Sequence, residues 1–369
     1  MEQSIVNKNS VKQNKKIKSA QKLAKKYYGE KMFERVSAPK AKIRKIADIT
    51  DISYLDLCGG SDTKGGVLIE SKDTLIALCR ENMLEGRSGN RFKTADKLEN
   101  FKTPGGILIV NAVECDPGLL HDAWIYRNRA EDVVRGINIL NNCFNFSDII
   151  IGTKEPLRDN YNGIKQVKVK DRFPMGYEKT LIKTVLGMEL PAEIRPTDRG
   201  ILVLNIQTVL AISELAGGQN TGDIRYITAV DTSEAKGFVV RVKTGTPVNE
   251  IVEKIYKIKT DKVCVGDGAL SCHRVKNDEL VQQSTGFVGL GEMPDYENSR
   301  KCVGCGQCER NCPSGVNIRK IVQYCEKNGK VDAEQCSGFR ADSCIGCGAC
   351  TYSCHAGKDI RTLVAQVKH

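Results

Sequence analysis

The sequence predicts an α/β protein with three folded parts behind a basic N-terminal arm, and three observations lead to this class. Between residues 107 and 215, apolar runs of strand length alternate with helical periods, as in a sheet with crossover helices. From residue 225 the pattern changes to short strands around one helix. The C-terminal part holds eight cysteines in two copies of one spacing.

The basic arm comprises residues 1–50, with a weak helical pattern at 12–35. It contains 14 lysines and arginines against four acidic residues, so it supplies +10 of the net charge of +11 of this 369-residue chain. Such a run is usually a solvated, partly disordered segment, but it could also dock on an acidic partner subunit or on an anionic membrane surface. Few aromatic residues are interleaved with the charges, which disfavours nucleic acid as a partner.

The first folded part, residues 51–222, is expected to have a Rossmann-like core. An irregular connection is expected at 54–66 and a helix at 71–83. We predict strands at 107–111, 149–151 and 201–204, and helices at 130–143, 177–186 and 207–215. The alternation favours parallel strands with crossover helices, although periodicity leaves the strand order open.

The second folded part, residues 223–292, has the pattern of two strands, a helix and a strand. The strands are expected at 226–230, 237–243 and 263–265, and the helix at 248–258. This order resembles a small β-grasp (SLBB-like) domain. The glycine-rich stretch 284–292 is expected to be a connection to the next part.

The third folded part, residues 293–369, carries the motif C-x2-C-x2-C-x3-C twice. The motifs comprise Cys302, Cys305, Cys308 and Cys312, and then Cys344, Cys347, Cys350 and Cys354. This is the spacing with which bacterial ferredoxins hold [4Fe–4S] clusters, and there the fourth cysteine ligates the other cluster. We therefore expect Cys354 to complete the first cluster and Cys312 to complete the second. Structural zinc is the alternative, but its cysteine pairs usually lie far apart in sequence.

The two motifs belong to a longer repeat. An offset of 42 residues relates every ligand of the first motif to one of the second, and it also relates Asn317 to Asp359, two expected helix N-caps. The same offset pairs apolar positions spaced i, i+3, i+4 and i+7, namely Ile318, Ile321, Val322 and Cys325 with Ile360, Leu363, Val364 and Val367. Each half therefore predicts a ligand loop and an amphipathic helix, giving a mostly helical two-cluster ferredoxin-type domain. Two clusters in one small fold indicate electron transfer.

Composition favours the cytoplasm. Cluster thiolates need a reducing compartment, and the eight cysteines outside the motifs are scattered singly, which disfavours a disulfide framework. No apolar run approaches the length of a transmembrane span, and the N-terminus lacks the apolar core of a secretory signal. The arm would also allow a position peripheral to the inner face of the membrane.

The order of these segments resembles that of the RnfC family of Rnf electron-transport complexes. The residues that carry the resemblance are Asn111-Ala-Val-Glu-Cys-Asp-Pro117, Asn205-Ile-Gln-Thr208, the β-grasp segment and the two cysteine motifs. Cobalamin reductases of propanediol microcompartments and the electron-transfer protein associated with D-proline reductase look like the same group, and the complex I flavoprotein subunit shares the core. The resemblance covers residues 70–369, whereas the arm does not match the barrel-like N-terminal region of RnfC proteins.

The resemblance implies FMN on the Rossmann-like domain, NADH as electron donor and one-electron transfer through the clusters. It places Gly86, Gly89 and Lys97 in the flavin loop, and it places Asn111, Glu114 and Asn205 along the flavin or nicotinamide. Each position also has a structural alternative: glycines of this spacing occur in many loops, Glu114 could shape a turn, and Asn205 could be a helix N-cap.

The chain departs from the family in two loops. Arg87, Asn90, Arg91 and Lys93 stand where the family has small residues or proline, so they could narrow the flavin site or bind the phosphates of a ligand. The run Gly266-Asp-Gly-Ala-Leu-Ser-Cys272 replaces a Gly-Gly-Pro-Met-Met-Gly type run.

Three functions follow from these observations. The leading hypothesis is an electron-transfer subunit that relays electrons through two [4Fe–4S] clusters. Its donor would be NADH with a flavin, or a partner protein, and its acceptor a partner reductase or a multi-subunit membrane complex. The second is a complete NADH-dependent FMN reductase of a small acceptor such as a corrinoid. The third is a docking or scaffold protein with structural clusters. No catalytic side chain is assigned.

Overall fold

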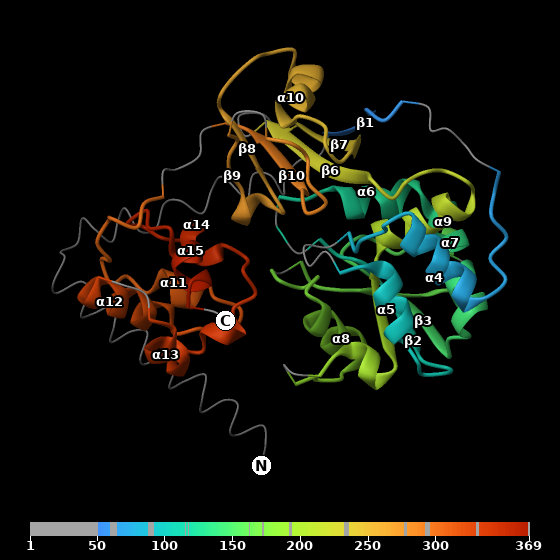
Figure 1. The fold of residues 1–369 in the computed structure, drawn as a ribbon, viewed down its shortest axis with the longest axis horizontal. Coiled ribbons are helices and arrows are strands. Elements are labelled where there is room, and N and C mark those ends of the chain that lie inside the picture. The colour runs from blue at the N-terminus through green and yellow to red at the C-terminus, as the bar shows by residue number, and fades with distance from the viewer. Residues whose placement is uncertain are drawn as a thin grey trace. The chain divides into compact units, whose positions relative to one another are not determined.

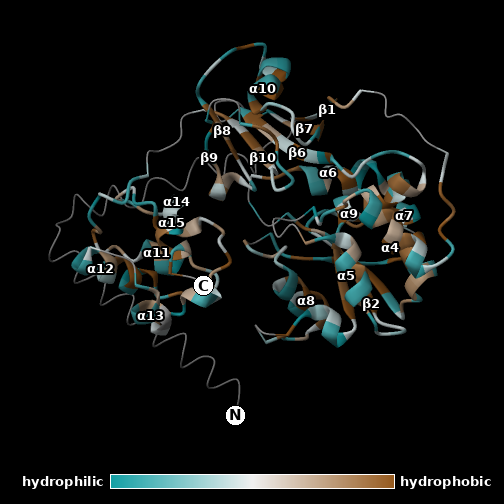
Figure 2. Cartoon of the chain, in the orientation of Figure 1, coloured by the Kyte–Doolittle hydropathy of each residue, from teal (hydrophilic) through white to brown (hydrophobic). Residues whose placement is uncertain are grey.

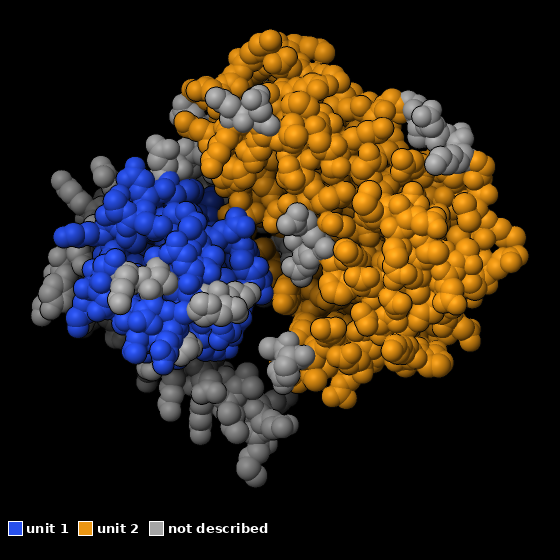
Figure 3. All heavy atoms as spheres, in the orientation of Figure 1, with its two compact units in different colours: residues 1–42, 294–369 blue, residues 43–293 orange. Residues whose placement is uncertain are grey.

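The computed structural model describes residues 51–59, 65–87, 92–114, 116, 118–161, 163–171, 173–191, 194–231, 236–276, 279–291, 296–329 and 332–367. The chain divides into two compact units, residues 43–293 and residues 294–369 with 1–42, which Figure 3 draws in different colours. The basic arm and its expected helix at 12–35 lie outside the described residues. Each unit has its own hydrophobic core.

A parallel sheet of four strands organises the first part of the larger unit (Figure 1). Its order is β4-β3-β2-β5, and every neighbouring pair is parallel. The strands are β2 (Ile107–Ala112), β3 (Asp148–Thr153), β4 (Lys165–Lys168) and β5 (Ile201–Asn205). The three strands expected from the sequence are confirmed. The structure adds β4, a short edge strand without a buried side chain, which has no apolar run to mark it.

Helices cover both faces of this sheet because alternate side chains of a strand point to opposite sides. Leu108 and Val110 of β2, a strand coloured hydrophobic in Figure 2, pack in one core, whereas Ile109 packs with Leu181 and Ile182 in another. The helices are α4 (Lys72–Glu81), α5 (Thr94–Asn100), α6 (His121–Asn128), α7 (Ala130–Phe144), α8 (Glu178–Leu186) and α9 (Ile206–Ala216). The four helices expected here are confirmed, α5 and α6 are additional, and the predicted α/β class is confirmed.

A second sheet completes the larger unit, with the order β1-β7-β6-β10-β8-β9. Helix α10 (Val248–Tyr256) packs on its apolar face. The strands are β1 (Asp51–Asp56), β6 (Ile224–Asp231), β7 (Lys236–Lys243), β8 (Val263–Gly266), β9 (His273–Arg274) and β10 (Phe287–Leu290). The expected order of two strands, a helix and a strand is therefore present as β6, β7, α10 and β8.

Two expectations about connections are wrong in part. The stretch 284–292 contains the buried strand β10, which pairs with both β6 and β8, and the stretch 54–66 begins inside β1, which pairs with β7. Strand β10 is short, and the strands that pair with β1 and β10 lie far from them in sequence. Local turn signals from glycines therefore outweighed the strand signal.

The cysteine-rich unit is mostly helical, as expected. Its helices are α11 (Gln307–Arg310), α12 (Ile318–Asn328), α13 (Ala333–Cys336), α14 (Ala349–Tyr352) and α15 (Ile360–Ala365). The first residues of α11 and α14, and those of α12 and α15, are related by the 42-residue offset. The eight repeated apolar positions are all buried. Asp359 caps α15 by accepting from the amide of Thr362, whereas the Asn317 side chain makes no such bond. Among the described residues, no helix combines the length and hydrophobicity needed to cross a membrane.

Candidate functional site

A cavity in the cysteine-rich unit is lined by cysteines from both motifs. Cys312 of the first motif lies there with Cys344, Cys347 and Cys350 of the second. The rest of the lining is largely apolar and includes Val316, Ile318 and Val364. The structure thus brings together the four cysteines that the sequence assigns to one cluster, and most of the side chains around them are apolar.

The other four cysteines also approach one another. The pKa of the Cys302 thiol is raised by burial and, to a lesser extent, by the nearby Cys305 and Cys354. Backbone amides point at the sulfurs: Gly304 donates to Cys302 Sγ and Lys358 to Cys354 Sγ, both at 3.4 Å. Gly346 donates to Cys344 Sγ at 3.4 Å in the second motif. Such N–H···S bonds orient ligand sulfurs and set cluster potentials.

Burial makes these thiols poor acids by themselves. It raises the pKa of Cys308, and it raises the pKa of Cys350 to about 12, with a further contribution from the neighbouring thiols. Thiolates at these positions therefore need a compensating positive charge. Iron supplies such a charge, since coordination keeps a thiol deprotonated. The donor set and its surroundings fit iron–sulfur clusters.

A buried cation lies beside the first quartet. Lys358 is 3 % exposed, and its Nζ donates to the carbonyl oxygen of Asn298 at 2.7 Å and to that of Arg300. The same ammonium forms an ion pair with Glu326 at 3.0 Å, and Glu326 Oε1 accepts from the amide of Cys302 at 2.7 Å. Lys358 is therefore tied to the segment that carries the first ligand.

The larger unit has a candidate ligand site at the carboxyl edge of its parallel sheet. After β2 the chain adds β3 and then β4 on one side of β2. It then crosses over and adds β5 on the other side. The direction of winding therefore reverses between β2 and β5, and ligands of open α/β sheets bind outside the strand ends at such a switch point. Asn111 and Asn205 are register partners at the ends of these two strands.

The two asparagines are held by bonds within the protein. Asn111 Oδ1 accepts from the amide of Val113 at 3.1 Å, and its Nδ2 donates to the carbonyl oxygen of Gly176 at 2.8 Å. Asn205 Oδ1 accepts from the amide of Gln207 at 2.8 Å, so this residue is the N-cap of α9. Its Nδ2 donates to Asp122 Oδ2 at 2.7 Å. Each side chain is therefore fixed at this edge by one local bond and one bond to a segment distant in sequence.

Two buried carboxyl groups, Asp122 and Glu114, lie near each other, and Asp122 accepts the bond from Asn205. Glu114 accepts from the amide of Ala123 at 2.9 Å, while Asp122 lies in the first turn of α6. Burial, followed by the charge of Asp122, raises the pKa of Glu114 to about 8, and burial raises the pKa of Asp122 to about 7. The pair therefore holds protons near neutral pH. Sequence reasoning missed Asp122; its only signal is an acidic residue shortly after the 111–117 motif.

The expected flavin loop folds back on itself. Gly86 donates its amide to the carbonyl oxygen of Phe92 at 2.8 Å, and Thr94 donates to that of Leu84 at 2.8 Å. Lys97 does not point freely into a site, because it forms an ion pair with Glu178 at 2.7 Å. Gly89, with Asn90 and Arg91, lies outside the described residues. The structure thus places Gly86 opposite Phe92 in a short antiparallel pairing, and Lys97 in an ion pair between α5 and α8.

Arg87, one of the departures from the family, is a buried connector. Its amide donates to Thr208 Oγ1 at 3.0 Å, close to the start of α9. Its guanidinium donates to Gln283 Oε1 at 2.8 Å and to the carbonyl oxygens of Thr221 and Gly222, each at 2.9 Å. These donors are used within the protein, so Arg87 ties the loop to the segments that flank β6 and β10.

Several buried polar atoms around this edge have no hydrogen-bond partner. Among the described residues they include Glu85 Oε2, Asp122 Oδ1, and Nε and Nη1 of Arg225. Burial lowers the pKa of Arg225 to about 10, and the charges of Asp122, Asp267 and Glu85 partly oppose this shift. Leaving such groups unpaired is costly, and a polar ligand would satisfy them. Arg225, a charged residue in a buried strand, was also missed in the sequence.

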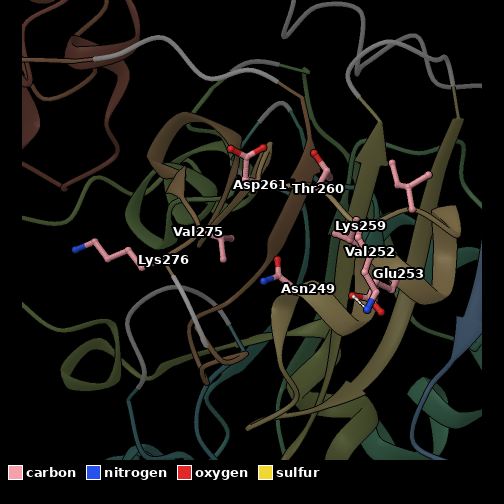
Figure 4. Close-up of a pocket in the computed structure, with 9 residues that line it drawn as sticks. Asn249, Val252, Glu253, Lys259, Thr260, Asp261, Val275 and Lys276 are labelled. Carbon is pink, nitrogen blue, oxygen red and sulfur yellow. Dashed lines mark ion pairs between the residues drawn. The ribbon is translucent and has the colours of Figure 1, made fainter.

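A separate surface hollow lies beside α10 (Figure 4). Its apolar residues include Val252 and Val275, and its polar residues include Asn249, Asp261 and Lys276. Lys259 and Glu253 of this hollow form a long ion pair at 3.8 Å with each other. None of the expected site residues lines it, so the hollow gives no reason to move the candidate site from the sheet edge.

A parallel sheet with a polar site at its switch point, joined in one chain to two crossed cysteine quartets, defines the class of flavin and iron–sulfur electron-transfer proteins. Residues 79–214 match the Nuo51 FMN-binding domain family. Residues 296–316 and 341–357 each match a 4Fe-4S binding domain family. The matches favour clusters over zinc, and they confirm the expected cofactor classes, an FMN-binding domain and two ferredoxin-type 4Fe–4S domains.

The chain is similar to the C subunit of the ion-translocating oxidoreductase complex, which confirms the predicted resemblance to the RnfC family. It is 28% identical to the Buchnera aphidicola protein over 272 residues, which are 69% of this chain and 53% of that protein. It is 27% identical to the Vibrio cholerae protein over 276 residues, which are 70% of this chain and 35% of that protein. The chain thus spans between about a third and about a half of these relatives.

A solved structure shows the same fold. The NAD+-reducing [NiFe]-hydrogenase in its air-oxidized state aligns with a TM-score of 0.57 and 16% identity, covering 80% of this chain and 61% of that chain. At this identity the likeness concerns the fold alone.

Proposed function

We propose that the protein is an electron-transfer subunit that relays electrons through two [4Fe–4S] clusters from FMN and NADH to a protein partner. The observation that carries this proposal is the cavity in which Cys312 meets Cys344, Cys347 and Cys350. Two clusters that exchange their fourth ligands lie close together, which suits one-electron transfer between them. When bound, the flavin would convert the two-electron chemistry of a nicotinamide into the one-electron chemistry of the clusters.

The cysteines would act as thiolate ligands in two crossed sets. One set is Cys302, Cys305, Cys308 and Cys354, and the other is Cys344, Cys347, Cys350 and Cys312. The amides of Gly304, Gly346 and Lys358 would donate to the ligand sulfurs and stabilise the reduced state. The buried faces of α12 and α15 would keep water from the clusters.

The edge of the parallel sheet would hold the FMN. Asn111, Glu114 and Asn205 would line the isoalloxazine or the nicotinamide. Gly86 and Gly89 would form the loop next to the flavin. Lys97 would support this loop by holding α5 to α8 through its ion pair with Glu178. The unpartnered guanidinium nitrogens of Arg225 favour an anionic group at this edge, and Asp122 would keep Asn205 in position.

The partner would be a multi-subunit complex. The relatives are named as subunits of an ion-translocating oxidoreductase complex, and we propose that the present chain is also a subunit of such a complex. We propose a cytoplasmic position, peripheral to the inner face of the membrane. The net charge of +10 in residues 1–50 supports docking of this arm on an acidic subunit or on anionic lipid.

The composition of anaerobically purified protein tests this proposal. Iron, acid-labile sulfide, zinc and flavin would be measured after incubation with FMN and removal of the unbound cofactor. We expect about eight irons, about eight sulfides and one flavin per chain. Zinc in place of iron would refute the clusters. Full iron without retained flavin would refute the FMN site and leave a relay that receives electrons from another subunit. Turnover of a corrinoid without any partner would instead support a complete reductase.

A further inference from the structure

Two cysteines outside the cluster motifs meet in the second sheet. Cys264 lies on β8, and Cys272 immediately precedes β9. In this antiparallel hairpin Cys264 is the register partner of Arg274. Because side chains alternate along a strand, Cys272, two residues before Arg274, lies on the same face as Cys264. The hairpin therefore places both thiols on one side of the sheet.

The two thiols are hydrogen-bonded to each other. Both pack in the small apolar cluster around Val230, Ala269 and Phe287, where Cys264 is 4 % exposed and Cys272 is partly buried. The loop between them is tightly closed: a Cβ on Gly266 would lie 2.7 Å from the Cα of Cys272. This position needs glycine because the backbone before Cys272 approaches so closely.

Their mutual bond distinguishes these thiols from another neighbouring pair. Burial raises the pKa of Cys79 on α4 and of Cys143 on α7, the charge of Cys143 raises that of Cys79 further, and no hydrogen bond between the two thiols contributes to either shift. In contrast, the hydrogen bond from Cys272 lowers the pKa of Cys264, and the same bond raises that of Cys272. A hydrogen bond between the two thiols places their sulfurs next to each other, and each thiol also donates to a backbone carbonyl oxygen, Cys264 to Gly289 at 3.4 Å and Cys272 to Ala269 at 3.1 Å. Neighbouring thiols of this kind can undergo thiol–disulfide exchange.

We propose that Cys264 and Cys272 are a redox-active dithiol that closes to a disulfide on reaction with a low-molecular-weight disulfide. Cys272, the more exposed thiol, loses its proton to water and attacks one sulfur of the small disulfide. This step forms a mixed disulfide and releases one small thiolate. Cys264 then loses its own proton, attacks the Cys272 sulfur and releases the second small thiolate. Two protein thiols are oxidised, one small disulfide is reduced to two thiols, and the two protons pass to water or to the leaving thiolates.

The pair is linked to the sheet edge by the turn that it encloses. The amides of Ala269 and Leu270, which lie between the two cysteines, donate to Asp116 at 3.0 and 2.9 Å. Asp116 belongs to the motif that follows β2. The loop is also one of the two places where the sequence departs from its family. The dithiol goes beyond the relay proposed above and does not depend on bound flavin.

The test uses one tryptic peptide that contains both cysteines, residues 263–274, bounded by Lys262 and Arg274. Full-length protein with intact clusters is equilibrated anaerobically with mixtures of oxidised and reduced glutathione, quenched in acid, unfolded, alkylated and digested. As oxidised glutathione increases, we expect this peptide to lose both alkyl groups and to appear two hydrogens lighter than the dithiol. Cys79 and Cys143 should be alkylated throughout. Two alkyl groups on the peptide at every ratio would overturn the proposal.

Two variants separate the roles of the two thiols. In Cys264→Ala, Cys272 should accumulate as a glutathione adduct, since no second thiol resolves it. In Cys272→Ala, the buried Cys264 should remain without glutathione. A glutathione adduct that persists on Cys272 in the unchanged protein would also overturn the proposal, because it would show that Cys264 cannot reach the mixed disulfide.

Discussion

The two candidate redox sites are stabilised in different ways. In the cysteine cavity, the ligand cysteines come from a short spacing that is repeated in the sequence, and the side chains around them are mainly apolar. At the edge of the parallel sheet, buried charges from separate segments meet, and Asp122 and Arg225 retain unpartnered polar atoms. Substitution of a ligand in the first site should therefore remove a whole cluster. Substitutions at the second site should instead change the stability by smaller amounts, and the change should depend on pH.

The largest effect is expected at the ligand that crosses between the motifs. Cys312→Ala should remove the cluster held by Cys344, Cys347 and Cys350, and Cys354→Ala should remove the other one. Each variant should retain about half of the iron, since each [4Fe–4S] cluster contains four irons. Iron analysis with electron paramagnetic resonance of the reduced protein measures this. Unchanged iron in both variants would mean that these cysteines are not ligands.

Glu114→Gln tests the proton-linked behaviour of the sheet edge. The folded-state pKa of about 8 lies above the ordinary value of 4.5, so the folded protein binds the proton more tightly than the unfolded chain. Stability is therefore lost as pH rises from about 4.5 to about 8. The variant keeps an acceptor for the Ala123 amide and should be more stable than the parent at pH 8, by roughly 1–3 kcal/mol.

The single tryptophan, Trp124 on α6, allows this comparison by fluorescence in urea. The free energy of unfolding of the two proteins should converge near pH 5, where the parent carboxyl is protonated in the folded state. An advantage of the variant that is equal at pH 5 and pH 8 would show that Glu114 does not bind a proton in this range.

Lys358→Met should change one cluster and leave the other nearly unchanged. At the offset of 42 residues, the counterpart of Lys358 is the apolar Val316, so only the first quartet has this buried cation. Removing the positive charge disfavours the reduced cluster and should lower its potential by tens of millivolts. A redox titration followed by electron paramagnetic resonance resolves this shift. Lys327→Met, at an exposed position of α12, is the control, and equal shifts in both variants would contradict the assignment.

The smallest effect is expected for the helix cap at the sheet edge. Asn205→Ala removes the side-chain acceptor for the Gln207 amide at 2.8 Å and should cost about 1 kcal/mol of stability. Asn205→Ser keeps a capping oxygen but, like alanine, loses the bond to Asp122. A difference between the two variants in urea midpoint therefore measures the cap. Equal midpoints would show that the cap contributes nothing measurable.

The sequence was sufficient where the pattern is local and repeated. The cysteine spacing, the offset of 42 residues and the i, i+3, i+4 periodicity predicted the cysteine-rich fold, because each half contains its own ligands and apolar face. In the same way, the runs at 107–111 and 201–204 predicted strands, since a strand buried on both faces is apolar throughout.

The remainder depends on contacts between distant segments. Strand β10 is buried only because β6 and β8 flank it, and glycines in its sequence resemble a turn. Asp122 belongs to the candidate site because it interacts with the charge of Arg225 and bonds to Asn205, which lies 83 residues away in sequence. Such pairings leave no periodic signal in the sequence, so Asp122 and Arg225 could not be selected before the fold was known.

The central claim is that electrons enter at the sheet edge and reach both clusters. The most direct measurement adds NADH, without oxygen, to protein loaded with FMN and follows cluster absorbance and electron paramagnetic resonance. The account predicts bleaching of the clusters and the signals of two reduced [4Fe–4S] centres, with no bleaching when FMN is omitted. Clusters that dithionite reduces but NADH with FMN leaves oxidised would contradict it.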